Sequence, residues 1–228
     1  MTPEKITVAL AGNPNSGKTT VFNALTGARQ HTGNWPGVTV EKKEGYCSLD
    51  TCRITVVDLP GVYSLTAYSL DEVVARDYIV DEQPDVVVDV VDASNLERNL
   101  YLTVQILEMQ VKMVIALNMM DAAKTRGHEI DIPKLSGLLG VPVVPMVAAR
   151  GEGVDELLDT IVKVADGTLP SRGTGIHYGQ DVENEITALE TALTGSISGG
   201  NYSPRWLSVK LLENDAEIMK KVKQTDGR

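Results

Sequence analysis

The sequence of 228 residues has few aromatic side chains and almost no cysteine. Aromatic residues make up 4% of the chain, with a single Phe, so its core must be aliphatic, as buried parallel strands are. The two cysteines, Cys47 and Cys52, form no CxxC motif, which argues against a disulfide framework or a zinc site and fits a reducing compartment. No apolar run reaches about 18 residues, the length that a membrane-spanning helix needs.

Basic residues are also scarce: the sequence has 21 basic and 31 acidic residues, for a net charge of −10. A protein that binds the phosphate backbone of nucleic acid needs a basic face, so we expect no nucleic-acid partner. A single nucleotide is still compatible, since a local site can be electropositive on an acidic protein. Hydrophobic residues at 43% and charged residues at 23% are typical of a globular protein.

Short apolar runs alternate with amphipathic segments along most of the chain. The runs predict six strands, at residues 6–11, 39–47, 52–58, 86–91, 113–118 and 141–146. Helical spacing of apolar residues predicts helices at residues 18–26, 70–81, 96–109, 132–139, 154–164, 182–193 and 206–212. This alternation indicates an α/β fold with a mostly parallel six-stranded sheet and helices on both faces. A change to Gly, Ser, Thr and Pro after residue 166 divides a first domain, 1–166, from a small all-helical domain, 167–228.

Residues 12–19, GNPNSGKT, match G-x-x-x-x-G-K-[ST] between a predicted strand and a predicted helix. In such a loop the backbone N–H groups point at phosphate oxygens, the lysine reaches the β- and γ-phosphates, and the last hydroxyl binds Mg²⁺. The motif in this context predicts a P-loop NTPase with a Ras-like G domain. The residues predicted to hold the nucleotide are Gly12, Asn13, Asn15, Ser16, Gly17, Lys18, Thr19 and Thr20.

Residues 118–121, NMMD, resemble the N-K-x-D motif that binds guanine, with Met119 at the position of the lysine. The Asp121 carboxylate can accept two hydrogen bonds from guanine, and adenine lacks that pair of donors, so GTP and GDP are the predicted ligands. Asn118 is expected to tie this motif to the phosphate loop, and Met119 to pack over the base.

Residues 148–150, AAR, are a weaker counterpart of a further base motif, Ser-Ala-Lys. The backbone N–H of Ala149 would donate to guanine O6. Ala148 replaces the usual serine, which predicts a mobile loop and fast release of GDP.

Two segments fit the switches of a G domain. Asp58 and Gly61 belong to a D-x-x-G element, in which Asp58 holds Mg²⁺ through a water and the Gly61 N–H senses the γ-phosphate. Residues 33–39, GNWPGVT, occupy the place of the first switch, with Thr39 as the candidate for Mg²⁺ and γ-phosphate and Thr32 as a competitor.

The residue after the D-x-x-G element is Val62, where Ras-like proteins have a Gln that orients the attacking water. Slow intrinsic hydrolysis is therefore expected unless another group supplies positive charge. The Asn15 side chain could help to hold K⁺ where an arginine finger acts, or it could only cap the loop. The catalytic candidates are Asn15, Lys18, Thr39 and Gly61.

Together these blocks resemble the cytosolic N-terminal region of the FeoB family of prokaryotic ferrous-iron transporters. The blocks that carry the resemblance are residues 12–27, 33–45, 58–65, 90–103 and 116–121. The resemblance implies a GTPase domain followed by a helical domain that is associated with tighter GDP binding. It also implies K⁺-stimulated hydrolysis, with the ion held by Asn15 and by backbone carbonyls near Gly33 and Trp35.

The family further implies a longer protein, in which this soluble part lies on the cytoplasmic side of the prokaryotic inner membrane. Its partners would be the membrane permease domain of the same polypeptide and a small cytosolic Feo accessory protein, and a homo-oligomer stays open. His31, His128 and His177 lack metal-ligand spacing, so no iron site is predicted here. GTP hydrolysis would regulate or drive ferrous-iron uptake.

Three other functions compete with this one. The first is a slow nucleotide-occupancy switch with negligible hydrolysis, which Val62 favours. The second is an Era-like GTPase that acts on RNA, against which the net charge of −10 argues. The third is an ATP-using P-loop kinase, against which Asp121 argues.

Overall fold

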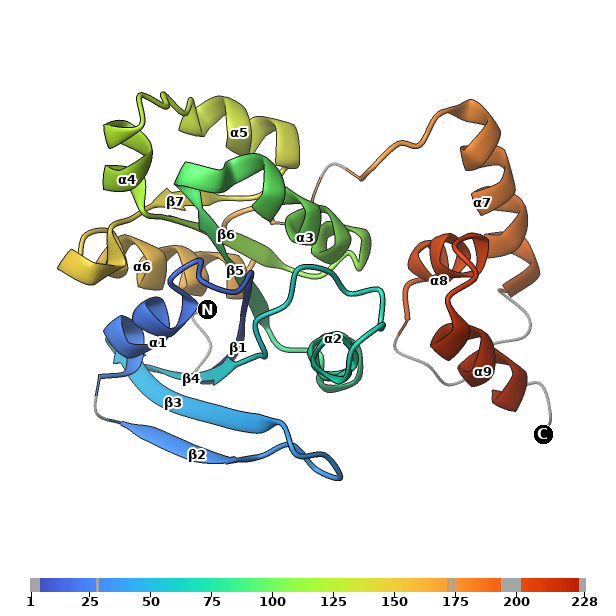
Figure 1. The fold of residues 1–228 in the computed structure, drawn as a ribbon, viewed down its shortest axis with the longest axis horizontal. Helices are drawn as coiled ribbons and strands as arrows, with labels where there is room; N and C mark the ends of the chain where they lie inside the picture. The colour runs from blue at the N-terminus through green and yellow to red at the C-terminus, as the bar shows by residue number, and fades with distance from the viewer. Residues whose placement is uncertain (1–4, 28, 172, 174, 194–201, 226–228) are drawn as a thin grey trace.

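The structure is a computed structural model, and it describes residues 5–27, 29–171, 173, 175–193 and 202–225 (Figure 1). Its strands form one sheet in the order β2-β3-β4-β1-β5-β6-β7. Five neighbouring strands run parallel, namely β4 (Cys52–Asp58), β1 (Lys5–Gly12), β5 (Val86–Asp92), β6 (Met113–Asn118) and β7 (Val143–Pro145). At one edge β2 (Gln30–Asn34) and β3 (Glu41–Leu49) continue the sheet in antiparallel pairs.

Helices cover both faces of the sheet. Apolar residues of α1 (Lys18–Thr26) and α6 (Val154–Ala165) share one core with Ile6, Val8 and Leu10 of β1. The other face packs against four helices, α2 (Leu70–Asp77), α3 (Leu96–Glu108), α4 (Met120–Thr125) and α5 (Ile132–Leu139). Every residue of the central strand β5 is buried, as a strand covered on both faces should be. The predicted P-loop α/β architecture is therefore confirmed.

The sheet has seven strands, so the predicted number of six was wrong. The additional strand, β2, has the sequence QHTGN, and all five of its residues are exposed. It is held by backbone pairing with β3, in which Gly33 is opposite Lys42. Because β2 buries no side chain, no hydrophobic pattern could reveal it. Gly33 and Asn34, which were predicted to begin the first switch loop, are instead the end of this strand.

Other differences lie at the ends of elements. The predicted helix at residues 70–81 ends in a π-helix, η1 (Tyr78–Glu82), whose first three residues are buried. The predicted strand at residues 141–146 is reduced to the three residues of β7. The short helix α4 was not predicted. Two 3₁₀ turns, η2 (Ala93–Asn95) and η3 (Ala148–Arg150), complete this part of the chain.

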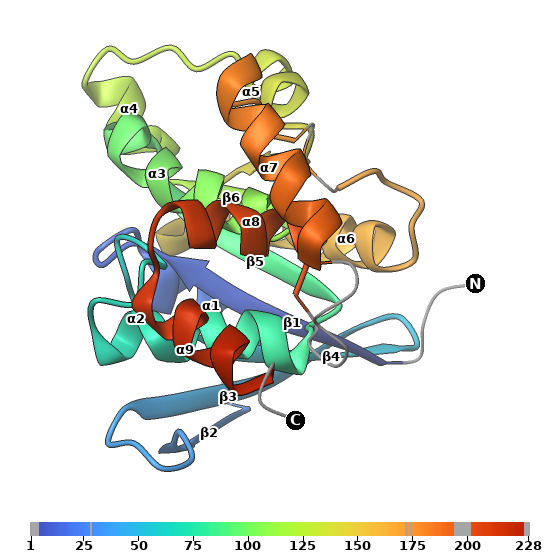
Figure 2. The same cartoon turned by 90° about the vertical axis from the view of Figure 1, so that its right-hand side faces the viewer.

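The C-terminal helices are α7 (Gln180–Leu193), α8 (Pro204–Leu212) and α9 (Ala216–Thr225), and they pack beside α2 and α3 (Figures 1 and 2). Trp206 and Leu207 of α8 belong to the core that covers α2 and α3. The guanidinium of Arg76 in α2, 1% exposed, forms an ion pair with Asp215 at 2.9 Å. This buried ion pair joins the residue before α9 to α2.

A carboxyl group is buried at the centre of the sheet. Asp89 of β5 is 1% exposed, and the hydroxyl of Thr103 in α3 donates to its Oδ2 at 2.6 Å. Burial raises the pKa of Asp89 to about 7, although the hydrogen bond from Thr103 opposes the shift. The folded protein therefore binds a proton at Asp89 that the unfolded chain releases above pH 4.

Substituting Asp89→Asn should remove a pH dependence of stability. Since the folded pKa lies above the unfolded one, the wild-type free energy of unfolding falls as pH rises from about 4 to 7 and then levels off. In denaturant unfolding, the free energy of unfolding of the variant minus that of the wild type should increase by about 1–3 kcal/mol from pH 5 to pH 8. An equal difference at both pH values would contradict a proton on Asp89.

Candidate nucleotide-binding site

The phosphate loop joins β1 to α1 and contains polar side-chain atoms that are buried without partners. Asn13 and Ser16 are 3% and 1% exposed, and among the described residues neither the Asn13 amide nor the Ser16 hydroxyl makes a hydrogen bond. An unsatisfied buried polar group costs about 1–3 kcal/mol. The loop therefore has hydrogen-bonding capacity to offer an anion, as the motif predicts.

Two glycines of the motif stand where a side chain would not fit. A Cβ atom on Gly12 would lie 2.7 Å from the carbonyl oxygen of Val90. Gly17 has a φ of +85°, and a Cβ there would overlap the side-chain amide of Asn118. The loop can approach β5 and β6 this closely only with glycine at both positions.

Asn118 joins three segments of the site. Its Nδ2 donates to the carbonyl oxygen of Ser16 at 3.0 Å, and its Oδ1 accepts from the N–H of Ala148 at 3.0 Å. Its side chain is 3% exposed, so both bonds are sheltered from water. The expected tie between the base motif and the phosphate loop is present, and it also fixes η3.

The guanine-specific position is already engaged in this structure. Oδ2 of Asp121 lies 3.2 Å from the guanidinium of Arg150, and its Oδ1 accepts the N–H of Ala122 at 2.9 Å. Met119, with a φ of 60°, precedes α4 and places its methyl group near Gly17. Ala148 is buried, whereas Ala149 is exposed beside it.

Lys18 and Asp58 neutralise each other. The Lys18 ammonium forms an ion pair with the Asp58 carboxylate and donates to the carbonyl oxygen of Leu59 at 2.6 Å. Both side chains are about nine-tenths buried, at 11% and 8% exposure. The groups predicted to take phosphate and Mg²⁺ are thus adjacent, and Thr19 and Thr20 are exposed at the start of α1.

The second switch also lies against the loop. Gly61 is close to Pro14, whose Cα would be 3.6 Å from a Cβ on that glycine. The N–H of Val62 donates to the carbonyl oxygen of Gly12 at 3.3 Å. The Val62 side chain is 5% exposed within the core, so it cannot orient water.

The first switch is held elsewhere, on the β2–β3 hairpin at the sheet edge (Figure 1). The Trp35 ring is buried edge-on against Tyr78, with ring centres 5.2 Å apart. Its carbonyl oxygen accepts the N–H of Val38 at 3.3 Å. Thr39 and Asn15 are both exposed. The structure thus brings the phosphate loop, Asp58 and Gly61 together, but it leaves Gly33, Trp35 and Thr39 on the hairpin.

Comparison with known proteins agrees with this geometry. The family model described as ferrous iron transport protein B matches residues 6–161, and that of the FeoB cytosolic helical domain matches residues 178–227. This chain belongs to the FeoB family. A Porphyromonas gingivalis Fe(2+) transport protein A/Fe(2+) transporter FeoB fusion protein is 46% identical over 93% of this chain.

Solved FeoB structures have the same fold. The cytosolic domain of the T. maritima FeoB iron transporter matches in a GDP form, with a TM-score of 0.91 and 42% identity over 97% of this chain and 86% of that one. Its GMPPNP form matches with a TM-score of 0.90 and 42% identity over 96% and 86%. The chain spans about a quarter of the length of its curated FeoB relatives, 26% in the P. gingivalis protein.

The FeoB motifs do not predict the ion pairs of Asp121 and Asp58. Each motif predicts which side chains meet a ligand, and in this structure the same side chains meet one another. The Arg150 of the AAR sequence was the one available signal for the Asp121 pair, because it occupies the place of the lysine in Ser-Ala-Lys.

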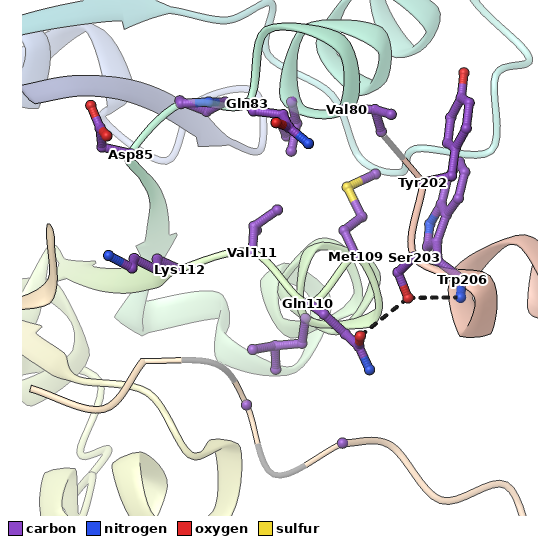
Figure 3. A pocket seen from close by; sticks show the side chains of 15 residues that line it. Val80, Gln83, Asp85, Met109, Gln110, Val111, Lys112, Tyr202, Ser203 and Trp206 are labelled. Carbon is purple, nitrogen blue, oxygen red and sulfur yellow. Dashed lines mark hydrogen bonds between the residues drawn. The ribbon is translucent and has the colours of Figure 1, made fainter. Parts of the chain in front are cut away.

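A cavity of about 780 Å³ lies away from this site, between the G domain and the helical part (Figure 3). Its walls come from η1, the end of α3 and the segment before α8, where Ser203 donates to Gln110 at 3.1 Å. None of its lining residues belongs to a nucleotide motif. No helix within the described ranges is long and apolar enough to cross a membrane.

Substituting Gly17→Ala should weaken nucleotide binding, because the new Cβ displaces the Asn118 amide from the phosphate loop. Gly151→Ala is a matched control, since Gly151 also has a positive φ, +74°, but open space around it. Titration with a fluorescent GDP analogue should show a loss of at least about tenfold for the first variant only. Equal affinities of the two variants would contradict the role of Asn118.

Proposed function

We propose that this chain binds and hydrolyses GTP, as a G domain at residues 1–166 with a helical domain at residues 167–228. GTP hydrolysis would regulate or drive ferrous-iron uptake by a membrane part of the same polypeptide. One observation carries the proposal. The phosphate loop has buried donors at Asn13 and Ser16 that find no partner in the described part of the chain, and Lys18 of the same loop is paired with Asp58.

The Lys18–Asp58 pair fits a site that takes Mg²⁺ together with a nucleotide. When both ligands enter, Lys18 can turn to the β- and γ-phosphates while Asp58 faces the cation. Neither buried charge is then left unpaired, which would otherwise cost several kcal/mol. The Thr19 hydroxyl supplies a further oxygen, the ligand atom that Mg²⁺ prefers. Bound Mg²⁺ would neutralise phosphate charge.

Guanine selection would rest on Asp121, with the N–H of Ala149 donating to O6 and Met119 packing over the base. Arg150 must leave Asp121 Oδ2 for the guanine N–H groups to bind there. Because this pair is half-exposed, its loss costs only about 0–1 kcal/mol. Because Ala148 lacks the hydroxyl of the usual serine, we expect this loop to hold GDP loosely.

Hydrolysis needs a first switch that has left the hairpin. Thr39 would then reach Mg²⁺ and the γ-phosphate, and the Gly61 N–H would contact the same phosphate. K⁺ would be held by the Asn15 side chain and by the carbonyl oxygens of Gly33 and Trp35. The ion would supply the positive charge that an arginine finger supplies elsewhere. The carbonyl oxygen of Trp35 that would contact K⁺ also accepts the N–H of Val38.

A slow nucleotide-occupancy switch is the second candidate, and the burial of Val62 favours it. In this case GTP binding alone would signal to the membrane part, and hydrolysis would only reset the site. The two candidates differ in whether turnover responds to a monovalent cation.

The relatives support partners beyond this chain. Because the P. gingivalis relative is named a fusion with Fe(2+) transport protein A, a small accessory protein of that type is a candidate partner. We place the chain on the cytoplasmic side of a prokaryotic inner membrane, attached to its permease domain. A homo-oligomer is compatible with this arrangement.

GTP turnover in KCl and in NaCl tests the hydrolytic function. We expect K⁺ to accelerate phosphate release by about tenfold or more, and Asn15→Ala to remove that gain, because the ion loses a ligand. Asn184→Ala, at an exposed position on α7, is the control and should keep it. Slow turnover that ignores the cation, with GDP binding intact, would favour the occupancy switch; no GDP binding would overturn both candidates.

A further inference from the structure

A second cavity lies at the opposite end of the sheet from the phosphate loop. Its volume is about 630 Å³, and it is lined by Lys5, Arg29, Tyr46, Cys47, Ser48, Thr51, Cys52, Arg53 and Thr55. Lys5 begins β1 and Gly12 ends it, so the two sites are about 23 Å apart along the strand. Nothing in the nucleotide motifs accounts for this cavity.

Sheet register places two of its cations side by side. Lys5 of β1 pairs with Arg53 of β4, and Arg53 is opposite Ser48 of β3. In the next row on the same face, Thr55 is opposite Tyr46. Neighbouring strands are about 4.8 Å apart, and like charges at such positions repel. This row therefore concentrates positive charge and hydroxyl groups.

The cations of the cavity take no part in the ion pairs found among the described residues. In the part of the chain that the structure describes, neither Lys5, Arg29 nor Arg53 forms an ion pair, and the cavity lining contains no Asp or Glu. One carboxylate, Asp85, lies near this end of the sheet: its Oδ2 accepts the N–H of Thr7, and its charge contributes to the raised pKa of Cys52. This grouping is unusual in a protein with a net charge of −10.

The thiols of the cavity add no negative charge. Burial raises the pKa of Cys47 to about 11, and burial also raises the pKa of Cys52. Both groups are therefore neutral near pH 7. The cavity lining contains three cationic residues and four residues with hydroxyl groups, whereas Cys47 and Cys52 pack against the core shared with α1 and α6.

We propose that this cavity binds a phosphate group, held by Lys5, Arg29 and Arg53. A guanidinium can donate two parallel hydrogen bonds to a phosphate, and an ammonium adds a compact charge. The hydroxyls of Ser48, Thr51 and Tyr46 supply further donors around the same space. The ligand is a phosphate ester, from a small phosphorylated molecule or from the headgroup of a phospholipid. This site is independent of the nucleotide site.

The test uses the whole chain with GDP and Mg²⁺ present, so that the phosphate loop is occupied. Inorganic phosphate is titrated while amide NMR signals are followed, and vesicles with and without phosphatidylglycerol are tested by co-sedimentation. Phosphate should shift the amides of Tyr46, Arg53 and Thr55, or the protein should bind the anionic vesicles. Arg53→Gln should weaken that binding by about tenfold, as expected for a lost charge-assisted bond. Lys134→Gln, an exposed cation on α5, should leave it unchanged.

Each outcome decides the proposal. Binding of free phosphate that Arg53→Gln weakens supports a small phosphorylated ligand, and binding of anionic vesicles alone supports a lipid headgroup. No binding of either probe overturns the site, as does an equal loss in the Arg53 and Lys134 variants, which indicates general electrostatics. If the chain fails to bind GDP, amide shifts at residues 12–19 on addition of phosphate show binding at the phosphate loop, and they are distinct from shifts at Tyr46, Arg53 and Thr55.

Discussion

The side chain of Asn118 is the constraint on which the nucleotide site depends. One amide group holds the phosphate loop through Ser16 and the base loop through Ala148. Because both bonds are buried, the loops at the carboxyl ends of β1, β6 and β7 behave as one unit. The close approach requires Gly17 to lack a side chain.

The switches are less tightly fixed, and they connect the site with the helical part. Trp35 packs on Tyr78 of the π-helix η1, which directly follows α2. Two residues before Tyr78, Arg76 of α2 forms an ion pair with Asp215 at the start of α9. Packed side chains and one buried ion pair therefore connect the first switch with the C-terminal helices.

Sequence alone predicted the fold well wherever side-chain burial forms a pattern. The Val-rich β5 and the run from Met113 to Asn118 are examples, because both faces of these strands are apolar. It could not predict β2, whose pairing uses only backbone atoms, or the π-helical end of the α2 segment. It predicted which side chains would contact ligands, but not the ion pairs that these side chains form with one another and with Arg150, such as Asp58 with Lys18 and Arg150 with Asp121. Those pairs depend on distances that no spacing in the sequence encodes.

The central claim is that the site is complete only when the first switch leaves its hairpin. Hydrogen exchange at the amides of residues 30–40 tests this claim most directly. The N–H of Trp35 is bonded to Val40, and β2 is bonded to β3. Addition of GMPPNP with Mg²⁺ and K⁺ should remove protection from these amides, while residues 52–58 of β4 stay protected. Unchanged protection at residues 30–40, in a protein shown to have bound GMPPNP, would contradict this account of the switch.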